Sequence, residues 1–183
     1  MLNDGSGGFV ADGGFPGGSA TTTAVSLGDV NGDGHLDLVI GNDGEPNELL
    51  LNNGSGTFTS SATFDGGSDA TYALELADVD SDGDLDVIIG NWGAANQLLL
   101  NQGDGTFVPV TGFDSGSGQT RALAAGDANA DGHVDLLIGN YAEANLLLLN
   151  DGSGSFSADP SFDGGSAKTY ALAFGDADGG VPH

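Results

Sequence analysis

The sequence contains no cysteine and only two basic residues, Arg121 and Lys168, and these absences exclude several classes of protein. Without cysteine the chain forms neither a disulfide framework nor a thiolate metal site. With 27 acidic residues and a formal net charge of −25, it lacks the lysine and arginine that drive binding to nucleic acid and to anionic lipid surfaces. Nucleic acid is therefore not an expected partner, whereas cations are.

Long hydrophobic runs are also missing. No stretch approaches the roughly 18 apolar residues of a membrane-spanning helix, so no membrane insertion is expected. The N-terminus shows no basic-then-apolar secretion signal. What the chain does have is glycine, 34 of 183 residues, between short apolar blocks such as DLVIG and LLLN. This turn-dense composition predicts an all-β protein.

A period of 49 residues runs through the whole chain without insertions. It is clearest in the aspartates Asp29, Asp78, Asp127 and Asp176, and asparagines and phenylalanines recur at the same step. A fixed internal period of this length is typical of an array of equal modules. The chain therefore contains about 3.7 copies of one module.

Each module reads as four short strands separated by glycine-rich turns. In the second copy we expect strands at 71–77, 86–91, 97–101 and 106–110. Four antiparallel strands every 45 to 50 residues or so are typical of a β-propeller blade, whereas parallel β-helices have shorter repeats. We expect a partial blade at 1–20 (end of a third strand and a fourth strand), complete blades at 21–69, 70–118 and 119–167, and at 168–183 the first strand and truncated loop of a further blade.

An acidic loop follows the first strand of each copy. In the first copy, Asp29, Asn31, Asp33 and Asp37 place oxygen-bearing side chains close together, and Gly34 permits the sharp turn. Calcium takes six to eight hard oxygen ligands, so we expect one calcium ion per complete blade, three in all. The expected ligands are Asp29, Asn31, Asp33, the carbonyl of His35 and Asp37; Asp78, Asp80, Asp82, the carbonyl of Asp84 and Asp86; and Asp127, Asn129, Asp131, the carbonyl of His133 and Asp135.

Two features argue against an EF-hand, whose loop begins in the same way. The EF-hand needs a glutamate at its twelfth position and a helix on each side. Here the twelfth positions are Ile40, Ile89 and Ile138, inside expected strands. A fourth full site is not expected, because Gly180 stands where the first loop has Asp33.

These motifs resemble those of the FG-GAP or VCBS repeat family, the blades of integrin-α-like β-propellers. The resemblance lies in D-x-[DN]-x-D-G-x-x-D-[LV]-[LVI]-I-G-N followed by N-x-L-L-L-N-x-G-x-G-x-F, and it covers essentially the whole chain. It implies a calcium ion in the loop between the first and second strands of each blade. Such propellers serve in adhesion, in sugar binding and as accessory domains of secreted enzymes, so the function must be argued from the site.

A candidate ligand-binding face lies opposite the acidic loops. There the copies differ most: Asp43, Trp92 and Tyr141 share one equivalent position, and Thr23, Tyr72, Arg121 and Tyr170 share another. We expect Tyr72, Trp92, Arg121, Tyr141 and Tyr170 to be candidates for stacking on sugar rings; the alternative is that they pack between blades. His35 and His133 have no serine or cysteine nucleophile placed beside them, so we do not expect an enzyme.

The leading functional hypothesis is an extracellular, calcium-stabilised binding or adhesion module with a glycan or protein ligand. Extracellular calcium modules bind at about 0.1 to 1 mM, which fits this location. The alternatives are an accessory propeller of a secreted polysaccharide-degrading enzyme, and a structural or engineered repeat assembly. Because closed propellers have four to eight blades, we expect either part of a longer chain or a homo-oligomer whose copies share one ring, with the terminal pieces combined in a hybrid blade.

Overall fold

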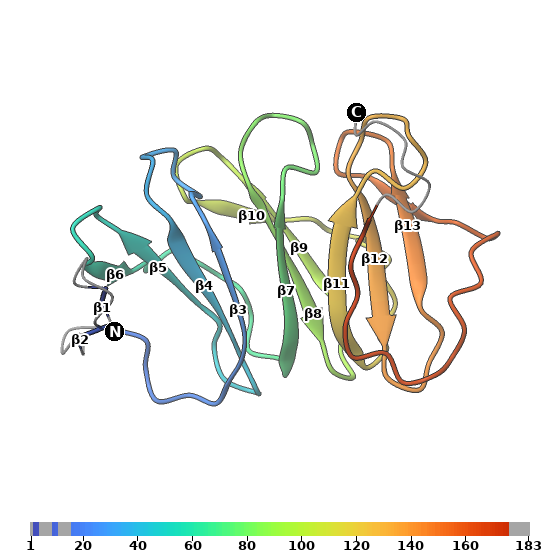
Figure 1. Cartoon of the computed structure of the whole chain (residues 1–183), viewed down its shortest axis with the longest axis horizontal. Helices are drawn as coiled ribbons and strands as arrows, with labels where there is room; N and C mark the ends of the chain where they lie inside the picture. Colours follow the sequence, from blue (N-terminus) through green and yellow to red (C-terminus); the bar gives the residue numbers. More distant parts are fainter. Residues whose placement is uncertain (1, 4–8, 11–15, 176–183) are drawn as a thin grey trace.

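Three four-stranded antiparallel sheets stand side by side in the computed structural model, which describes residues 2–3, 9–10 and 16–175 (Figure 1). Blade 1 contains β3 (Thr22–Gly28), β4 (Asp37–Asn42), β5 (Glu48–Asn52) and β6 (Phe58–Ser60). Blade 2 contains β7 (Thr71–Ala77), β8 (Asp86–Asn91), β9 (Gln97–Asn101) and β10 (Phe107–Pro109). Blade 3 contains β11 (Thr120–Gly126), β12 (Asp135–Asn140), β13 (Leu146–Asn150) and β14 (Phe156–Ala158). A short hairpin pairs β1 (Leu2–Asn3) with β2 (Phe9–Val10).

The three blades are meanders with the same register. Gly28 pairs with Asp37 in blade 1, and Ala77 pairs with Asp86 in blade 2. The prediction of an all-β chain built from four-stranded antiparallel propeller blades is confirmed. The described sheets do not close into a ring, and the fourth strand of blade 2 is shorter than expected, at Phe107–Pro109. Within the described ranges no helix is long and apolar enough to cross a membrane.

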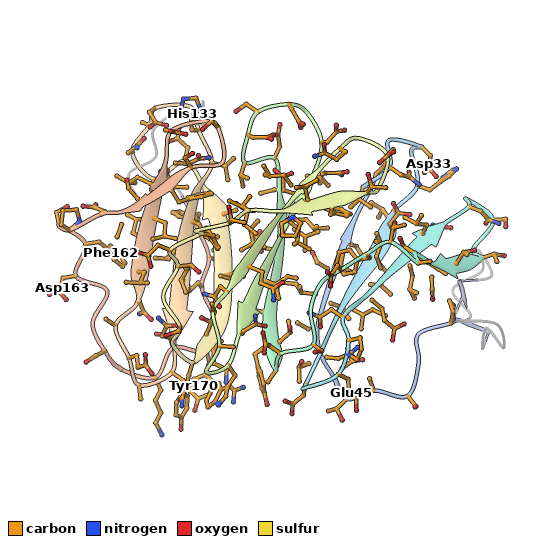
Figure 2. The ribbon with its side chains drawn as sticks, turned by 180° about the vertical axis from the view of Figure 1, so that it is seen from behind. Asp33, Glu45, His133, Phe162, Asp163 and Tyr170 are labelled. Carbon is orange, nitrogen blue, oxygen red and sulfur yellow. The ribbon has the colours of Figure 1, made fainter. Side chains whose placement is uncertain are left out.

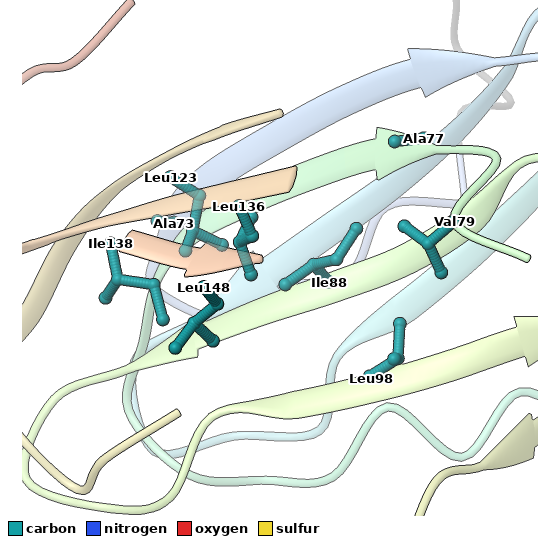
Figure 3. Close-up of a cluster of buried hydrophobic side chains, with 9 residues drawn as sticks. All are labelled: Ala73, Ala77, Val79, Ile88, Leu98, Leu123, Leu136, Ile138 and Leu148. Atoms are coloured by element: carbon teal, nitrogen blue, oxygen red, sulfur yellow. The ribbon is translucent and has the colours of Figure 1, made fainter. Parts of the chain in front are cut away.

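The hydrophobic cores lie between blades. Successive side chains of a strand point to opposite faces, so Val87 and Ile89 pack toward blade 1 while Ile88 packs toward blade 3. Figure 3 shows the second of these cores, where Ile88 and Leu98 meet side chains of β11, β12 and β13. Every residue of β8 is consequently buried.

A glycine in each second strand lets the next blade approach closely. A Cβ atom at Gly41 would lie 2.6 Å from Cγ2 of Thr71, and one at Gly90 would lie 2.7 Å from Cγ2 of Thr120. Any larger side chain would push the neighbouring first strand away. The glycine of the IGN motif is therefore an interface residue.

The first strands β3, β7 and β11 are neighbours across the blades. All three run in the same direction relative to their blades, so the acidic loops that follow them gather at one end of the molecule. Figure 2 shows Asp33 and His133 at this end and Glu45 and Tyr170 at the opposite end. The two candidate sites therefore occupy opposite ends of the blades.

Candidate functional site

The first aspartate of each acidic loop folds the loop back on itself. The Asp29 carboxylate accepts hydrogen bonds from the backbone N–H groups of Asp33 (3.2 Å) and Gly34 (2.7 Å). The Gly34 bond is the main cause that lowers the pKa of Asp29 below its ordinary value. Asp78 and Asp127 make the same pair of bonds in their own loops. These residues shape the loop as well as supplying oxygen atoms.

The last aspartate of each loop is fully buried at the start of the second strand. Asp86 accepts hydrogen bonds from the N–H groups of Val79 and Asn101, both at 2.8 Å. Burial raises the pKa of Asp86 to about 6, and burial also raises the pKa of Asp37. A carboxylate has about four lone-pair sites, so each of these side chains can still coordinate a cation.

The second loop brings three carboxylates together. Asp78, Asp80 and Asp86 each present an oxygen atom, and these atoms lie within 4.8 Å of one another. Asp80 Oδ1 is buried and has no hydrogen-bond partner in the described part of the chain. Burial and the neighbouring Asp82 raise the pKa of Asp80. A divalent cation supplies the positive charge that such a cluster needs, so the donor set fits calcium.

The first and third loops are arranged differently because asparagine replaces Asp80. The side-chain amide of Asn31 donates to Asp33 at 3.0 Å, and that of Asn129 donates to Asp131 at 2.8 Å. Among the described residues, only the second loop groups three acidic oxygens this closely. In each of the three copies the expected ligands lie between the first strand and the first residue of the second strand, which is Asp37, Asp86 or Asp135. Asp176 and Asp178 of the incomplete fourth loop lie outside the described residues.

The residues expected to bind through their carbonyls direct their side chains to the turn between the third and fourth strands. The His35 ring lies over Gly54, where a Cβ atom would be only 2.3 Å from Nε2, and His133 lies over Gly152 in the same way. Asp84 occupies the equivalent place over Gly103. The backbone N–H groups of these residues donate to Asp33, Asp131 and Asp82, each at 2.9 Å.

An asparagine ties each of the first two loops to the next blade, a role that the sequence did not reveal. The side-chain amide of Asn101 donates to the carbonyl of Val30 in the first loop at 2.8 Å, and that of Asn150 donates to Val79 in the second loop at 2.7 Å. The 49-residue period showed that every module carries this asparagine. It could not show that the amide reaches a neighbouring module.

The opposite end of the blades carries a row of aromatic rings. The centroids of Tyr72 and Trp92 are 5.5 Å apart, those of Trp92 and Tyr141 are 5.3 Å apart, and those of Tyr141 and Tyr170 are 5.8 Å apart. The guanidinium carbon of Arg121 lies 4.7 Å from the Tyr72 centroid and within 5.9 Å of the other three. All five residues predicted for the ligand face are thus brought together.

Lys168 is an additional member of this aromatic face that the sequence analysis missed. Its Nζ atom lies 4.6 Å from the Tyr141 centroid, and a hydrogen bond to the Tyr141 hydroxyl is the main cause that raises the pKa of Lys168. Both basic residues of the chain therefore lie at the end opposite the acidic loops. The rings pack across blades 2 and 3, and Tyr170 remains 61% exposed.

The chain is similar to one family of repeats in sequence and to a solved structure in fold. No curated protein matches the chain. A solved structure of an Agrocybe aegerita lectin, described as specifically recognising non-reducing terminal N-acetylglucosamine, is 28% identical, with a TM-score of 0.53. The match covers 75% of this chain and 37% of the lectin, so the chain spans well under two thirds of the lectin's length. The model of the FG-GAP-like repeat matches residues 29–89, 78–138 and 127–179. The chain therefore belongs to the FG-GAP-like repeat family.

Proposed function

We propose that the chain is a non-catalytic, extracellular binding module whose blades are stabilised by calcium. The observation that carries this proposal is the second acidic loop, where three carboxylate oxygens lie within 4.8 Å of one another and Asp80 Oδ1 is buried without a partner. Asp78, Asp80, Asp82 and Asp86 would hold the ion through side chains, with Asp84 contributing its carbonyl. The first and third loops would hold an ion through the equivalent atoms.

Calcium in these loops supplies positive charge to clustered carboxylates in a chain of net charge −25. Each site would add roughly 2.7 kcal/mol to the free energy of unfolding when free calcium is 100-fold above its Kd. Because Asn101 and Asn150 bind the carbonyls of Val30 and Val79 within the loops, ordering a loop also orders the blade–blade contact beside it. Calcium would therefore stabilise the array and not just single loops.

Isothermal titration calorimetry with calcium tests this proposal. We expect about three calcium ions per chain, and Asp80→Asn should weaken one of them. Asp69→Asn is the matched control, because Asp69 is an exposed aspartate outside the acidic loops. Absence of calcium binding at millimolar concentration, or equal effects of the two substitutions, would refute the proposal.

We further propose that the ligand is a glycan and that it binds the aromatic face formed by Tyr72, Trp92, Arg121, Tyr141, Lys168 and Tyr170. Aromatic rings offer apolar area with polar edges, and the two cations sit among them. The similarity to a lectin that recognises terminal N-acetylglucosamine supports a sugar ligand. Because the acidic loops lie at the other end, calcium would act on this face through blade packing.

A glycan array with N-acetylglucosamine-terminated oligosaccharides, probed with and without a chelator, tests the ligand. Trp92→Ala and Tyr170→Ala should reduce binding, whereas Phe162→Ala should not. Phe162 is the matched control because it is also partly exposed, at 37%, and lies away from the aromatic face. If no glycan is retained, or if the control substitution reduces binding equally, the glycan proposal fails while the calcium proposal still stands.

A further inference from the structure

Blade 1 exposes an apolar face that the other blades bury. The side chains of Val25, Leu27 and Leu36 are 60%, 59% and 56% exposed. One period later, Leu74, Leu76 and Leu85 occupy the equivalent positions of blade 2 and pack against the core shared with blade 1. The same part of the module is therefore an interface in blade 2 and a free surface in blade 1. We call Val25, Leu27 and Leu36 the leading face.

Blade 3 carries the opposite half of this interface. Leu137, Leu147 and Leu149 are half-buried, whereas the equivalents of Leu137 and Leu147 in blade 1, Val39 and Leu49, are 0% and 1% exposed. The difference arises because Val39 and Leu49 lie under a complete blade. We call Leu137, Leu147 and Leu149 the trailing face.

Residues 169–175 cover the trailing face only in part. A Cβ atom at Gly139 would lie 2.7 Å from Cγ2 of Thr169 and 2.9 Å from Cδ1 of Leu172, which repeats the contact of Thr71 with Gly41. The segment thus imitates the first strand of a following blade. It pairs with no strand in the described residues, and one backbone hydrogen bond, from Thr169 N–H to Asn140 O at 3.1 Å, anchors its start.

We propose that the leading face of one copy docks on the trailing face of a second copy in place of residues 169–175, and that two copies close a ring of six blades. The leading and trailing faces are complementary because they are the two sides of the contact that the chain already makes twice, between blades 1 and 2 and between blades 2 and 3. Six blades lie within the range of four to eight found in propellers. A head-to-tail contact that closes after two copies forms a ring, not a fibre.

Two further observations favour a second copy as the occupant. In the described residues, the Asn52 amide donates only to Leu36 O, whereas Asn101 and Asn150 also reach a neighbouring blade. Docking would place the carbonyl of exposed Ala128 opposite Asn52, as Val30 lies opposite Asn101. The similar lectin chain is about twice as long as this one, judged from the shares covered, so two copies supply a comparable length.

Sedimentation equilibrium of the full chain tests the proposal. Measurements need saturating calcium and about 0.3 M salt, because two chains of charge −25 repel each other and salt screens that repulsion. We expect a reversible monomer–dimer equilibrium that reaches twice 18.0 kDa. Lower salt or added chelator should weaken the dimer.

Two substitutions shift this equilibrium in opposite directions. Leu27→Asp places a charge in the docked interface and should raise the dimer Kd at least about 100-fold, given the contribution of a buried leucine and the cost of burying a charge. Leu172→Asp should lower the Kd, because it weakens the competing segment 169–175. Val108→Asp is the control and should change nothing, since Val108 is 52% exposed on the outer strand β10.

Mixing two variants separates a broken interface from a misfolded chain. Leu27→Asp keeps an intact trailing face, and Leu149→Asp keeps an intact leading face, so the two monomeric variants should form a heterodimer through one interface. The proposal is overturned if the chain stays monomeric at all concentrations or forms an assembly larger than two copies. It is also overturned if the dimer survives Leu27→Asp, if Leu172→Asp weakens the dimer, or if no heterodimer forms on mixing.

Discussion

Replacing Asn101 by alanine should destabilise the chain more than the same replacement of Asn52. Asn101 is 1% exposed, and its amide donates to Val30 O of blade 1 at 2.8 Å and to Leu85 O at 3.0 Å. Its Oδ1 atom accepts from Gly103 N–H at 3.1 Å. Asn52 makes the equivalents of the last two bonds, with Leu36 O and Gly54 N–H, and within the described residues its side chain makes no bond to another blade.

The difference between the two variants isolates the bond between blades. Bonds within the module cancel in the comparison, so the excess cost for Asn101 is that of leaving the buried Val30 carbonyl without its partner. A buried polar group left without a hydrogen bond costs about 1 to 3 kcal/mol. Asn150→Ala should show a smaller excess, because the Val79 carbonyl that accepts from Asn150 at 2.7 Å also accepts from the Gly154 N–H at 3.1 Å and keeps that partner.

Urea denaturation in saturating calcium measures these differences in the free energy of unfolding. All variants should be made in a Leu27→Asp background, so that no second copy supplies a partner for Asn52. If Asn52→Ala costs as much as Asn101→Ala, the bond between blades contributes nothing and the reasoning is refuted.

Three further predictions concern the acidic loops and the half-buried Glu75. Removing calcium with a chelator should lower the melting temperature measured by circular dichroism, because the clustered carboxylates then repel one another; an unchanged melting temperature would contradict the calcium proposal. The second loop should bind calcium most tightly, so Asn31→Asp should strengthen the first site in calorimetry, and an unchanged or weaker first site would count against this ranking. Burial raises the pKa of Glu75, so its contribution to stability is present below the pKa of the unfolded chain and is lost as the pH rises through the raised folded value. Glu75→Gln should remove that loss of stability. Urea denaturation between pH 4 and pH 8 at constant calcium would then show a free energy of unfolding that depends less on pH in the variant than in the original chain. The same pH dependence in both chains would exclude a role for Glu75.

Much of the fold follows from local pattern. Residues 71–77, 86–91 and 97–101 were expected as strands and are β7, β8 and β9, because apolar runs of this length between glycine-rich turns leave few alternatives. The fourth strand was less well predicted, since its end depends on pairing with β9 and not on its own composition. The acidic loops were also visible, because their donors lie within nine residues of one another along the chain.

The sequence by itself determined the module: its 49-residue period, its four strands and its acidic loop, all of which depend on residues close in the chain. Only the tertiary structure decided how the neighbouring module changes the burial and the hydrogen-bond partners of equivalent positions. Val25 is exposed while its equivalent Leu74 packs in a core, and Asn101 bridges two blades while Asn52 does not. The physical reason is that burial and hydrogen-bond partners at a module's surface come from the adjacent module, and a repeated sequence does not say which of its copies has a neighbour.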